Sequence, residues 1–357
     1  MKIAVLAGDG IGPEVMTQAL RVLAAIATKF KLQFDFTDGL IGGAAHDQYQ
    51  VHFPDETQQI CEAADAILFG SIGGPIDQAH LPKWDGCEVN SLLALRKAFC
   101  FKVNYRPAKV YPMLKEICPL KDAIIENGID ILILRELLGG IYFGEHKVIE
   151  EGNQLKAIDV CEYSESDIEP IAVAAFDVAR LRKKRVLSVD KANVLQTSKL
   201  WRAVFNKVGK RYPDIELKHM LVDNCAMQLI TNPSQFDVIA TTNMFGDILS
   251  DAAAVLPGSL GLMPSASLNQ AGFGMYEPSG GSAPDIAGKN IANPIAQILS
   301  AAMMLRYSFK LEDAAMCIET AVNKTLEAGF RTADIASKGA KSCSTGEMTD
   351  QIIKHCG

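Results

Sequence analysis

Residues Thr241-Thr-Asn-Met-Phe-Gly-Asp-Ile-Leu-Ser-Asp251 carry the chain from a short strand into a helix that presents two carboxylates. The apolar run from Asp237 to Ala240 just before them predicts a buried strand. Residues four apart lie on one face of a helix, so Asp247 and Asp251 point in the same direction. Because like charges repel, this pair would be stabilised by Mg²⁺ or Mn²⁺, whose preferred ligands are carboxylate oxygens. Taken alone, the segment is also consistent with two exposed aspartates on a solvated helix.

The second half of the chain alternates helical and strand patterns on both sides of this segment. Apolar runs predict strands at 186–189 and 217–222, and helical periodicity predicts helices at 167–182, 198–208 and from 223 onward. In the first half, strands are expected at 2–7, 32–36, 66–70 and 130–134, an extended segment at 101–111, and helices at 14–29 and 91–99. Such alternation is typical of an α/β protein with a largely parallel sheet.

Two segments depart from this alternation. Residues 257–293 are rich in Gly, Pro and Ser, and we expect a long functional loop there. Residues 147–161 have extended character without a helical pattern, which indicates a projecting hairpin or arm. Helices at about 294–307, 311–328 and 347–355 complete the predicted elements.

Composition limits the classes of protein to which the chain can belong. A length of 357 residues predicts two domains, and 48% hydrophobic with 22% charged residues is typical of a globular protein. The net charge of −7 argues against a nucleic-acid partner. The nine cysteines form no C-x-x-C pair, which favours reduced thiols in a cytoplasm. The chain begins directly with a strand and has no apolar stretch near ~20 residues, so we expect neither a signal peptide nor a membrane partner.

Charged residues follow several of the predicted strands at the point where each strand ends. Lys191 and Asp223 each follow an apolar run in the second half, and Arg135 follows the run 131–134. Ligands of open α/β sheets gather beyond the carboxyl ends of the strands, although each of these residues alone could be an ordinary surface charge. Asp223 with Asp247 and Asp251 could supply three carboxylates to one cation.

Other side chains suit a small acidic substrate. Arg96, Arg106 and Arg135 could form a cluster for a substrate with two carboxylates, because a guanidinium pairs with a carboxylate through two parallel hydrogen bonds. Beside a cation and arginines, Lys191 is a candidate general base, and Tyr142 is a candidate proton donor. The turn Gly8-Asp-Gly-Ile-Gly-Pro13 reads G-x-G-x-G-P rather than G-x-G-x-x-G, so it predicts a tight turn and not a dinucleotide fingerprint.

Six segments, taken in order, resemble the metal-dependent β-decarboxylating dehydrogenases of the isocitrate and isopropylmalate family. The resemblance is collinear over essentially the whole chain. The segments are Gly8-Asp-Gly-Ile-Gly-Pro-Glu-Val15, Leu92-Leu-Ala-Leu-Arg96, Arg135-Glu-Leu-Leu-Gly-Gly-Ile-Tyr-Phe-Gly144, Ser188-Val-Asp-Lys-Ala-Asn-Val194, Asn243-Met-Phe-Gly-Asp-Ile-Leu-Ser-Asp251 and Gly281-Ser-Ala-Pro-Asp-Ile-Ala-Gly-Lys289.

The resemblance implies a two-domain αβα fold that is not a Rossmann fold and has a large mixed, mainly parallel sheet. Residues 1–101 and 258–357 would form a discontinuous cofactor-side domain. Residues 102–257 would form the metal, substrate and dimerisation domain, with an intersubunit arm near 145–162. The family's arrangement implies a homodimer in which Lys191 and Asp223 reach into the partner's active site.

The resemblance also implies an activity, the NAD⁺-dependent oxidation and decarboxylation of (2R,3S)-3-isopropylmalate to 4-methyl-2-oxopentanoate in leucine biosynthesis. The three arginines would bind the malate carboxylates, and Asp223, Asp247 and Asp251 would hold Mg²⁺ or Mn²⁺, with Asp223 also near the substrate. Lys191 would take the hydroxyl proton, and Tyr142 would help to supply the proton that C3 receives after carbon dioxide is lost. Leu92 and Leu93 could face the branched alkyl group, or could be core leucines of an amphipathic helix.

The resemblance also implies a set of cofactor-binding residues, most of which lie in the long loop at 257–293. They are Ile11, Gly74, Gly281, Ser282, Ala283, Asp285, Ile286 and Asn293. A carboxylate at Asp285 accepts hydrogen bonds from both ribose hydroxyls and repels a 2′-phosphate, so NAD⁺ is expected over NADP⁺.

The chain departs from the family pattern at Gly280, where many members have a histidine, and over Ile76–Asn90. Two alternatives stay open at this point. A D-malate, tartrate or homoisocitrate dehydrogenase would use the same machinery, and a regulatory subunit would bind ligand without turnover.

Overall fold

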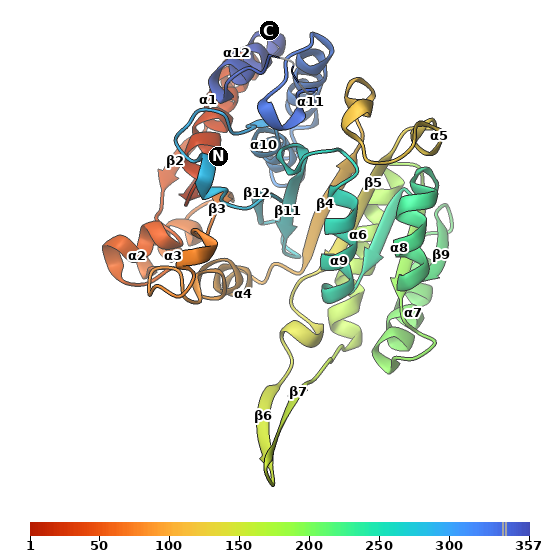
Figure 1. The fold of residues 1–357 in the computed structure, drawn as a ribbon. Coiled ribbons are helices and arrows are strands. Elements are labelled where there is room, and N and C mark those ends of the chain that lie inside the picture. The colour runs from red at the N-terminus through yellow and green to blue at the C-terminus, as the bar shows by residue number, and fades with distance from the viewer. Residues whose placement is uncertain (338, 340) are drawn as a thin grey trace. The chain divides into compact units, whose positions relative to one another are not determined.

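The structure, a computed structural model, describes residues 1–337, 339 and 341–357, which fall into two compact units (Figure 1). Unit 1 comprises residues 1–99, 111–119 and 257–357, and unit 2 comprises residues 100–110 and 120–256. The domain boundaries expected from the sequence, at 101/102 and 257/258, remain a prediction. None of the helices in the described residues is both long and apolar enough to cross a membrane.

Unit 1 is a sheet covered by helices. Its strands lie in the order β2-β1-β3-β12-β11, and all neighbours are parallel except the antiparallel pair β12 and β11. Their bounds are β1 Lys2–Gly8, β2 Asp35–Asp38, β3 Ala66–Ser71, β11 Pro264–Leu268 and β12 Gly274–Pro278. The helices are α1 Gly12–Phe30, α2 Gly43–Tyr49, α3 Asp55–Glu62, α4 Ala94–Ala98, α10 Ile295–Tyr307, α11 Glu312–Glu327 and α12 Thr345–Cys356.

The core of unit 1 centres on α10. Residues 295–305 of this helix are all buried, because α10 packs against β11 and β12 as well as against α1 and α11. A helix that is mostly apolar around its circumference is expected to be covered in this way. By contrast, α1 is amphipathic: it begins next to Pro13, a residue suited to the first helical turn, and buries one face.

Unit 2 has the same kind of layering. Its strands lie in the order β4-β5-β10-β8-β9, and all neighbours are parallel except the antiparallel pair β4 and β5. Their bounds are β4 Val103–Lys109, β5 Asp130–Glu136, β8 Arg185–Asp190, β9 Glu216–Leu221 and β10 Val238–Thr241. The helices are α5 Asp122–Ile125, α6 Glu165–Arg180, α7 Gln196–Gly209, α8 Val222–Thr231 and α9 Asn243–Ala254.

Two pairs of helices cover the sheet of unit 2. Helix α6 packs against α7, and α8 packs against α9. Because parallel strands are joined by right-handed crossovers, the connections through α6 and α7 place this pair on one face, and the connection through α8 returns on the opposite face. The α/β class with mixed, mainly parallel strands is therefore confirmed.

A hairpin projects from unit 2 (Figure 1). Its strands β6 (His146–Glu151) and β7 (Gln154–Asp159) pair only with each other, in antiparallel register. The extended segment expected at 147–161 is thus a two-stranded hairpin. Most of its side chains are exposed.

Three local predictions were wrong. The expected loop at 257–293 contains β11 and β12, whose Ser, Ala and Pro residues carry little strand propensity and form strands because neighbouring strands pair with them. The strand expected at 32–36 begins only at Asp35, and all of β2 is exposed. The single helix expected at 91–99 is a π-helical turn, Val89–Leu93, followed by α4.

Candidate active site

A charged cluster lies where α9 begins in unit 2. Strand β10 ends at Thr241, and α9 starts at Asn243. Asp247 and Asp251 both lie on α9, four residues apart. Asp247 forms an ion pair with Arg135 and accepts a hydrogen bond from the Tyr142 hydroxyl at 3.1 Å. Asp251 forms an ion pair with Arg106 Nη1 at 3.0 Å. The structure therefore brings together five of the predicted site residues.

The two arginines come from neighbouring antiparallel strands, β4 and β5. Arg106 donates from Nε to Asn104 at 2.8 Å and from Nη1 to Ser250 at 3.1 Å. Arg135 is buried and donates from Nε and Nη2 to Asn243 Oδ1 at 3.0 and 2.9 Å. Both guanidinium groups are thus fixed by neutral oxygens on one side and face an aspartate on the other.

Tyr142 closes the cluster from the short 3-10 helix Gly140–Tyr142. Burial raises the pKa of the Tyr142 hydroxyl, and the negative charge of Asp247 raises it further, while Arg135 opposes this effect. The guanidinium carbon of Arg135 lies 5.8 Å from the centre of the Tyr142 ring. The phenol consequently keeps its proton at neutral pH, and it can act as a proton donor.

Lys191 and Asp223 form a separate pair. Lys191 follows β8, Asp223 lies in the first turn of α8, and their side chains meet at 2.9 Å. The hydrogen bond from Lys191 lowers the pKa of the Asp223 carboxyl. Among the described residues of one chain, no three His, Cys, Asp or Glu side chains gather closely enough to hold a metal ion. Asp223 thus does not join Asp247 and Asp251 within a single chain.

The acidic side chains of α9 nevertheless have the chemistry of a divalent-cation site. Carboxylate oxygens suit Mg²⁺ and Mn²⁺, and the side chain of Asp251 is 71% exposed. Each aspartate is already paired with a positively charged side chain, Asp247 with Arg135 and Asp251 with Arg106. An incoming metal ion would therefore share these carboxylates with the arginines.

Arg96 lies in unit 1 on α4. It is buried and donates from Nη2 to Glu277 at 3.0 Å, while its buried Nε has no hydrogen-bond partner. A buried N–H without a partner is costly, so this side chain is suited to an additional anionic ligand. Leu92 is buried and Leu93 half-buried in the π-helical turn just before α4.

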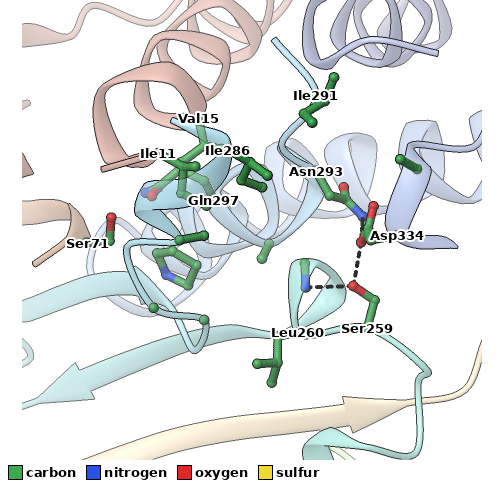
Figure 2. Close-up of a pocket in the computed structure, with 17 residues that line it drawn as sticks. Ile11, Val15, Ser71, Ser259, Leu260, Ile286, Ile291, Asn293, Gln297 and Asp334 are labelled. Carbon is green, nitrogen blue, oxygen red and sulfur yellow. Dashed lines mark hydrogen bonds between the residues drawn. The ribbon is translucent and has the colours of Figure 1, made fainter. Parts of the chain in front are cut away.

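Unit 1 also holds a cavity of about 470 Å³ (Figure 2). Most of its lining is apolar, and on one side Asn293 and Ser259 both donate to the Asp334 carboxylate, Asn293 at 3.0 Å. The other lining residues are Ile11, Val15, Ser71, Leu260, Gly261, Pro278, Gly280, Gly281, Ala283, Ile286, Ile291, Ala296, Gln297 and Ala333. Such a cavity, apolar with a few placed polar groups, is typical of a cofactor site.

Five predicted cofactor residues line this cavity: Ile11, Gly281, Ala283, Ile286 and Asn293. The lining leaves out Asp285, which is exposed, and Ser282, whose carbonyl accepts from the Ile11 N–H at 2.8 Å. It also leaves out Gly74, where an added Cβ would lie 2.2 Å from the Trp84 ring.

The sequence argument missed Gln297 in this cavity. Its carboxamide is buried, and neither Nε2 nor Oε1 has a hydrogen-bond partner (Figure 2). A glutamine in the otherwise apolar first turns of α10, four residues after Asn293, was the available signal. Unsatisfied donors and acceptors beside an apolar cavity fit a ligand that contains a flat ring with polar edges, such as a base of a dinucleotide.

Comparison with known proteins gives consistent matches. Residues 2–352 match the family model described as isocitrate/isopropylmalate dehydrogenase. The 3-isopropylmalate dehydrogenases of Escherichia coli and Salmonella typhimurium are each 55% identical to the chain, over 99% of it and 97% of their own length. Isocitrate dehydrogenase from Methylococcus capsulatus has a similar structure, with a TM-score of 0.86, 34% identity and 99% of both chains covered. A β-decarboxylating dehydrogenase from Thermococcus kodakarensis has a TM-score of 0.80 at 33% identity, over 99% of this chain and 96% of its own.

Proposed function

The chain belongs to the isocitrate/isopropylmalate dehydrogenase family and is a decarboxylating oxidoreductase, and on this premise we propose its reaction. It oxidises and decarboxylates (2R,3S)-3-isopropylmalate to 4-methyl-2-oxopentanoate, and it uses NAD⁺ and Mg²⁺ or Mn²⁺. The reaction belongs to leucine biosynthesis and takes place in the cytoplasm. The observation that carries the proposal is the cluster of Arg106, Arg135, Asp247 and Asp251 with the Tyr142 hydroxyl. The names of the 55% identical relatives support the choice of substrate.

The arginines bind the two malate carboxylates. Each guanidinium of unit 2 is oriented by a neutral oxygen, from Asn104 or Asn243, and so presents its remaining N–H groups in a fixed direction. Arg96 contributes its unpaired Nε, and Leu92 and Leu93 beside it contact the alkyl group. Binding and orientation of this kind place the reacting carbon without any chemical step by the arginines.

Two side chains move protons. Lys191 accepts the proton of the 2-hydroxyl as general base, and Tyr142 donates a proton to C3 after carbon dioxide has left. The raised pKa of Tyr142 keeps that proton available at neutral pH. Asp247 and Asp251, with Asp223 of the partner subunit, would hold the divalent ion. When bound, NAD⁺ accepts the hydride and the metal ion draws electron density from the carbonyl oxygen.

The active unit is a homodimer with shared sites. Four large apolar side chains are more than half exposed on the paired helices α8 and α9 or directly after α9: Met227, Ile230, Ile248 and Val255. Val148 and Leu155 are similarly exposed on the β6–β7 hairpin. Exposed apolar groups gathered on neighbouring elements are typical of an interaction surface. Pairing through this surface would give Lys191 and Asp223 access to the partner's α9.

The cofactor occupies the cavity of unit 1. Asn293, on the polar side of the cavity, would lie near the adenine of NAD⁺ with Ile11 beneath it, and Ala283 and Ile286 line the same cavity. Asp285, exposed next to this lining, would accept hydrogen bonds from the ribose hydroxyls and repel a 2′-phosphate.

The test is an assay of NADH formation with a panel of 3-substituted malates, with and without EDTA. We expect kcat/KM for 3-isopropylmalate to exceed that for unsubstituted D-malate at least about a hundredfold, because an apolar pocket recognises the alkyl group. Chelation of the metal should abolish turnover, and added Mn²⁺ should restore it. Comparable turnover of D-malate would overturn the isopropyl assignment, and unchanged activity in EDTA would overturn the metal dependence.

A further inference from the structure

We propose that Glu136 and Tyr163 are positioning residues, which complete a closed ring of hydrogen bonds that fixes the Tyr142 hydroxyl against Asp247. This inference rests on the proposed function, in which Tyr142 is the proton donor. It concerns two side chains that lie behind the charged cluster of unit 2.

Glu136 is the last residue of β5, and only 2% of it is exposed. Its carboxylate accepts hydrogen bonds from the backbone N–H of Leu138 at 2.7 Å and of Gly139 at 2.9 Å. These donors belong to the turn that leads from β5 to Tyr142. Burying a carboxylate without hydrogen-bond partners costs free energy, so these two bonds stabilise the turn in the conformation that places its N–H groups against Glu136.

Tyr163 connects that carboxylate to α9. Its hydroxyl donates to Glu136 Oε2 at 3.1 Å and accepts from the backbone N–H of Asn243, at the start of α9, at 3.0 Å. The Tyr163 ring is buried and meets the buried Trp201 edge-on, with ring centres 6.1 Å apart. The hydroxyl is thus held by its ring between the turn and the helix.

The two glycines of the turn leave room for this ring. A Cβ added at Gly139 would lie 2.6 Å from the Tyr163 ring, and one at Gly140 would lie 2.5 Å from its hydroxyl. Gly140 also has a φ of 74°, which side-chain-bearing residues rarely adopt. The Gly139-Gly140 pair therefore permits direct contact between the turn and Tyr163.

The remaining contacts close the ring. Asn243 donates from its amide to the Gly139 carbonyl at 3.2 Å and accepts from Arg135. Arg135 pairs with Asp247, and Asp247 accepts from the Tyr142 hydroxyl at 3.1 Å. The contacts between Glu136, Tyr163, Asn243, Arg135, Asp247 and Tyr142 are hydrogen bonds and an ion pair, and the covalent chain from Gly139 to Tyr142 closes the ring. Loss of the Tyr163 hydroxyl would leave both the Glu136 carboxylate and the Asn243 N–H without this partner.

A double-mutant cycle with Tyr142→Phe and Tyr163→Phe tests the inference. In the wild-type background, we expect Tyr163→Phe to lower kcat about tenfold, with KM for substrate and NAD⁺ within about twofold, because a misplaced proton donor affects the chemical step. In the Tyr142→Phe background, Tyr163→Phe should have no further effect on kcat. If Tyr163 acts only through the Tyr142 hydroxyl, the effects of the two substitutions on kcat are not additive. A merely structural role would lower kcat by the same factor in both backgrounds, and that result would overturn the inference.

The control is Tyr212→Phe, which removes a tyrosine–carboxylate hydrogen bond, to Asp177 at 2.9 Å, elsewhere in unit 2. We expect its kcat to equal that of the wild type. If Tyr163→Phe fails to fold, Glu136→Gln replaces it in the cycle, since an amide cannot accept from every donor that the carboxylate serves. Full turnover by Tyr142→Phe would overturn the proposed role of Tyr142 together with this inference, whereas a slow Tyr142→Phe with additive Tyr163→Phe would overturn the inference alone.

Discussion

At the scale of single residues, the charge balance of α9 differs from the sequence-based argument. From the sequence, Asp247 and Asp251 form a like-charge pair that a divalent cation would stabilise, or two exposed aspartates on a solvated helix. In the structure each carboxylate has its own arginine, Arg135 or Arg106, on an adjacent strand. A metal ion is therefore not needed to relieve their repulsion in one chain. Its proposed role is instead to connect these carboxylates to substrate oxygens.

A second buried carboxylate, Asp9, gives a prediction on pH dependence. It accepts hydrogen bonds from the N–H groups of Gly43 at 2.9 Å, Ala44 at 2.8 Å and Gly73 at 3.0 Å. Burial raises the pKa of its carboxyl above the ordinary value of 3.8, and the hydrogen bonds offset only part of that effect. Since the folded-state pKa lies above the unfolded value, the stability linked to this proton is fully present below 3.8 and is lost as pH rises through the folded pKa.

Asp9→Asn removes this linkage. We expect the free energy of unfolding of the wild type, relative to that of Asp9→Asn, to increase as pH falls from neutral towards 3.8. The measurement is urea denaturation of both proteins at a series of pH values, followed by circular dichroism. Two parallel curves of stability against pH would show that the carboxyl titrates alike in both states and would contradict the prediction.

At the scale of elements, the turn after β1 is determined by contact with the loop before α10. Gly10 has a φ of 57°, and a Cβ there would lie 2.0 Å from the Ser282 carbonyl oxygen. The neighbouring Ile11 N–H donates to the same oxygen at 2.8 Å. The glycines of this turn therefore allow two backbones to approach, and the contact fixes one wall of the cavity in unit 1.

Gly10→Ala should disrupt that wall. Positive φ and the clash with the Ser282 carbonyl together predict a loss of about 2–4 kcal/mol in the free energy of unfolding, and we expect NADH to bind at least about tenfold more weakly. Gly272→Ala is a matched control, because Gly272 also has a positive φ, 83°, but no atom near its Cβ position. The control should lose only about 1 kcal/mol and bind NADH normally. Equal NADH affinities for the two variants, measured by fluorescence titration, would refute the role of the contact.

The elements that could be predicted from the sequence are those determined by local patterns, and the elements that were missed depend on tertiary contacts. Periodicity located α6, β8 and β10, because their patterns of apolar residues are local. It missed β11, whose Pro-Ser-Ala-Ser-Leu sequence becomes a strand only through its neighbours. The arginine–aspartate pairs were also invisible, since they depend on side chains brought together from distant segments, whereas the position of Gln297 in an apolar helix was visible but its lack of hydrogen-bond partners was not.

At the scale of the whole molecule, the described part of one chain does not hold a complete set of metal ligands. Lys191 and Asp223 bond each other, and Asp247 and Asp251 bond arginines. The exposed apolar side chains of α8 and α9 lie on the helices that carry three of these aspartates. The proposed association through this surface would account for both the apolar exposure and the incomplete ligand set of the described residues.

Active-site complementation tests whether the sites are shared. Lys191→Ala and Asp247→Asn should each abolish turnover, because one lacks the proposed base and the other a proposed metal ligand. In a mixed dimer, one site would combine the intact Asp247 of the first chain with the intact Lys191 of the second. Random reassociation of equal amounts should therefore restore about a quarter of wild-type activity, since half of the dimers are mixed and each has one intact site.

The two variants are refolded together and separately, and the rate of NADH formation is then measured for each sample. Co-refolding Lys191→Ala with a Lys191→Ala/Asp247→Asn double variant is the control, because no pairing of these chains contains an intact Lys191. It should remain inactive. Failure of the first mixture to regain activity, in dimers verified by light scattering, would mean that Lys191 and Asp247 act within one chain. The separate Lys191–Asp223 pair would then have to rearrange inside its own chain to reach α9. The proposal that the two subunits share each active site would be wrong.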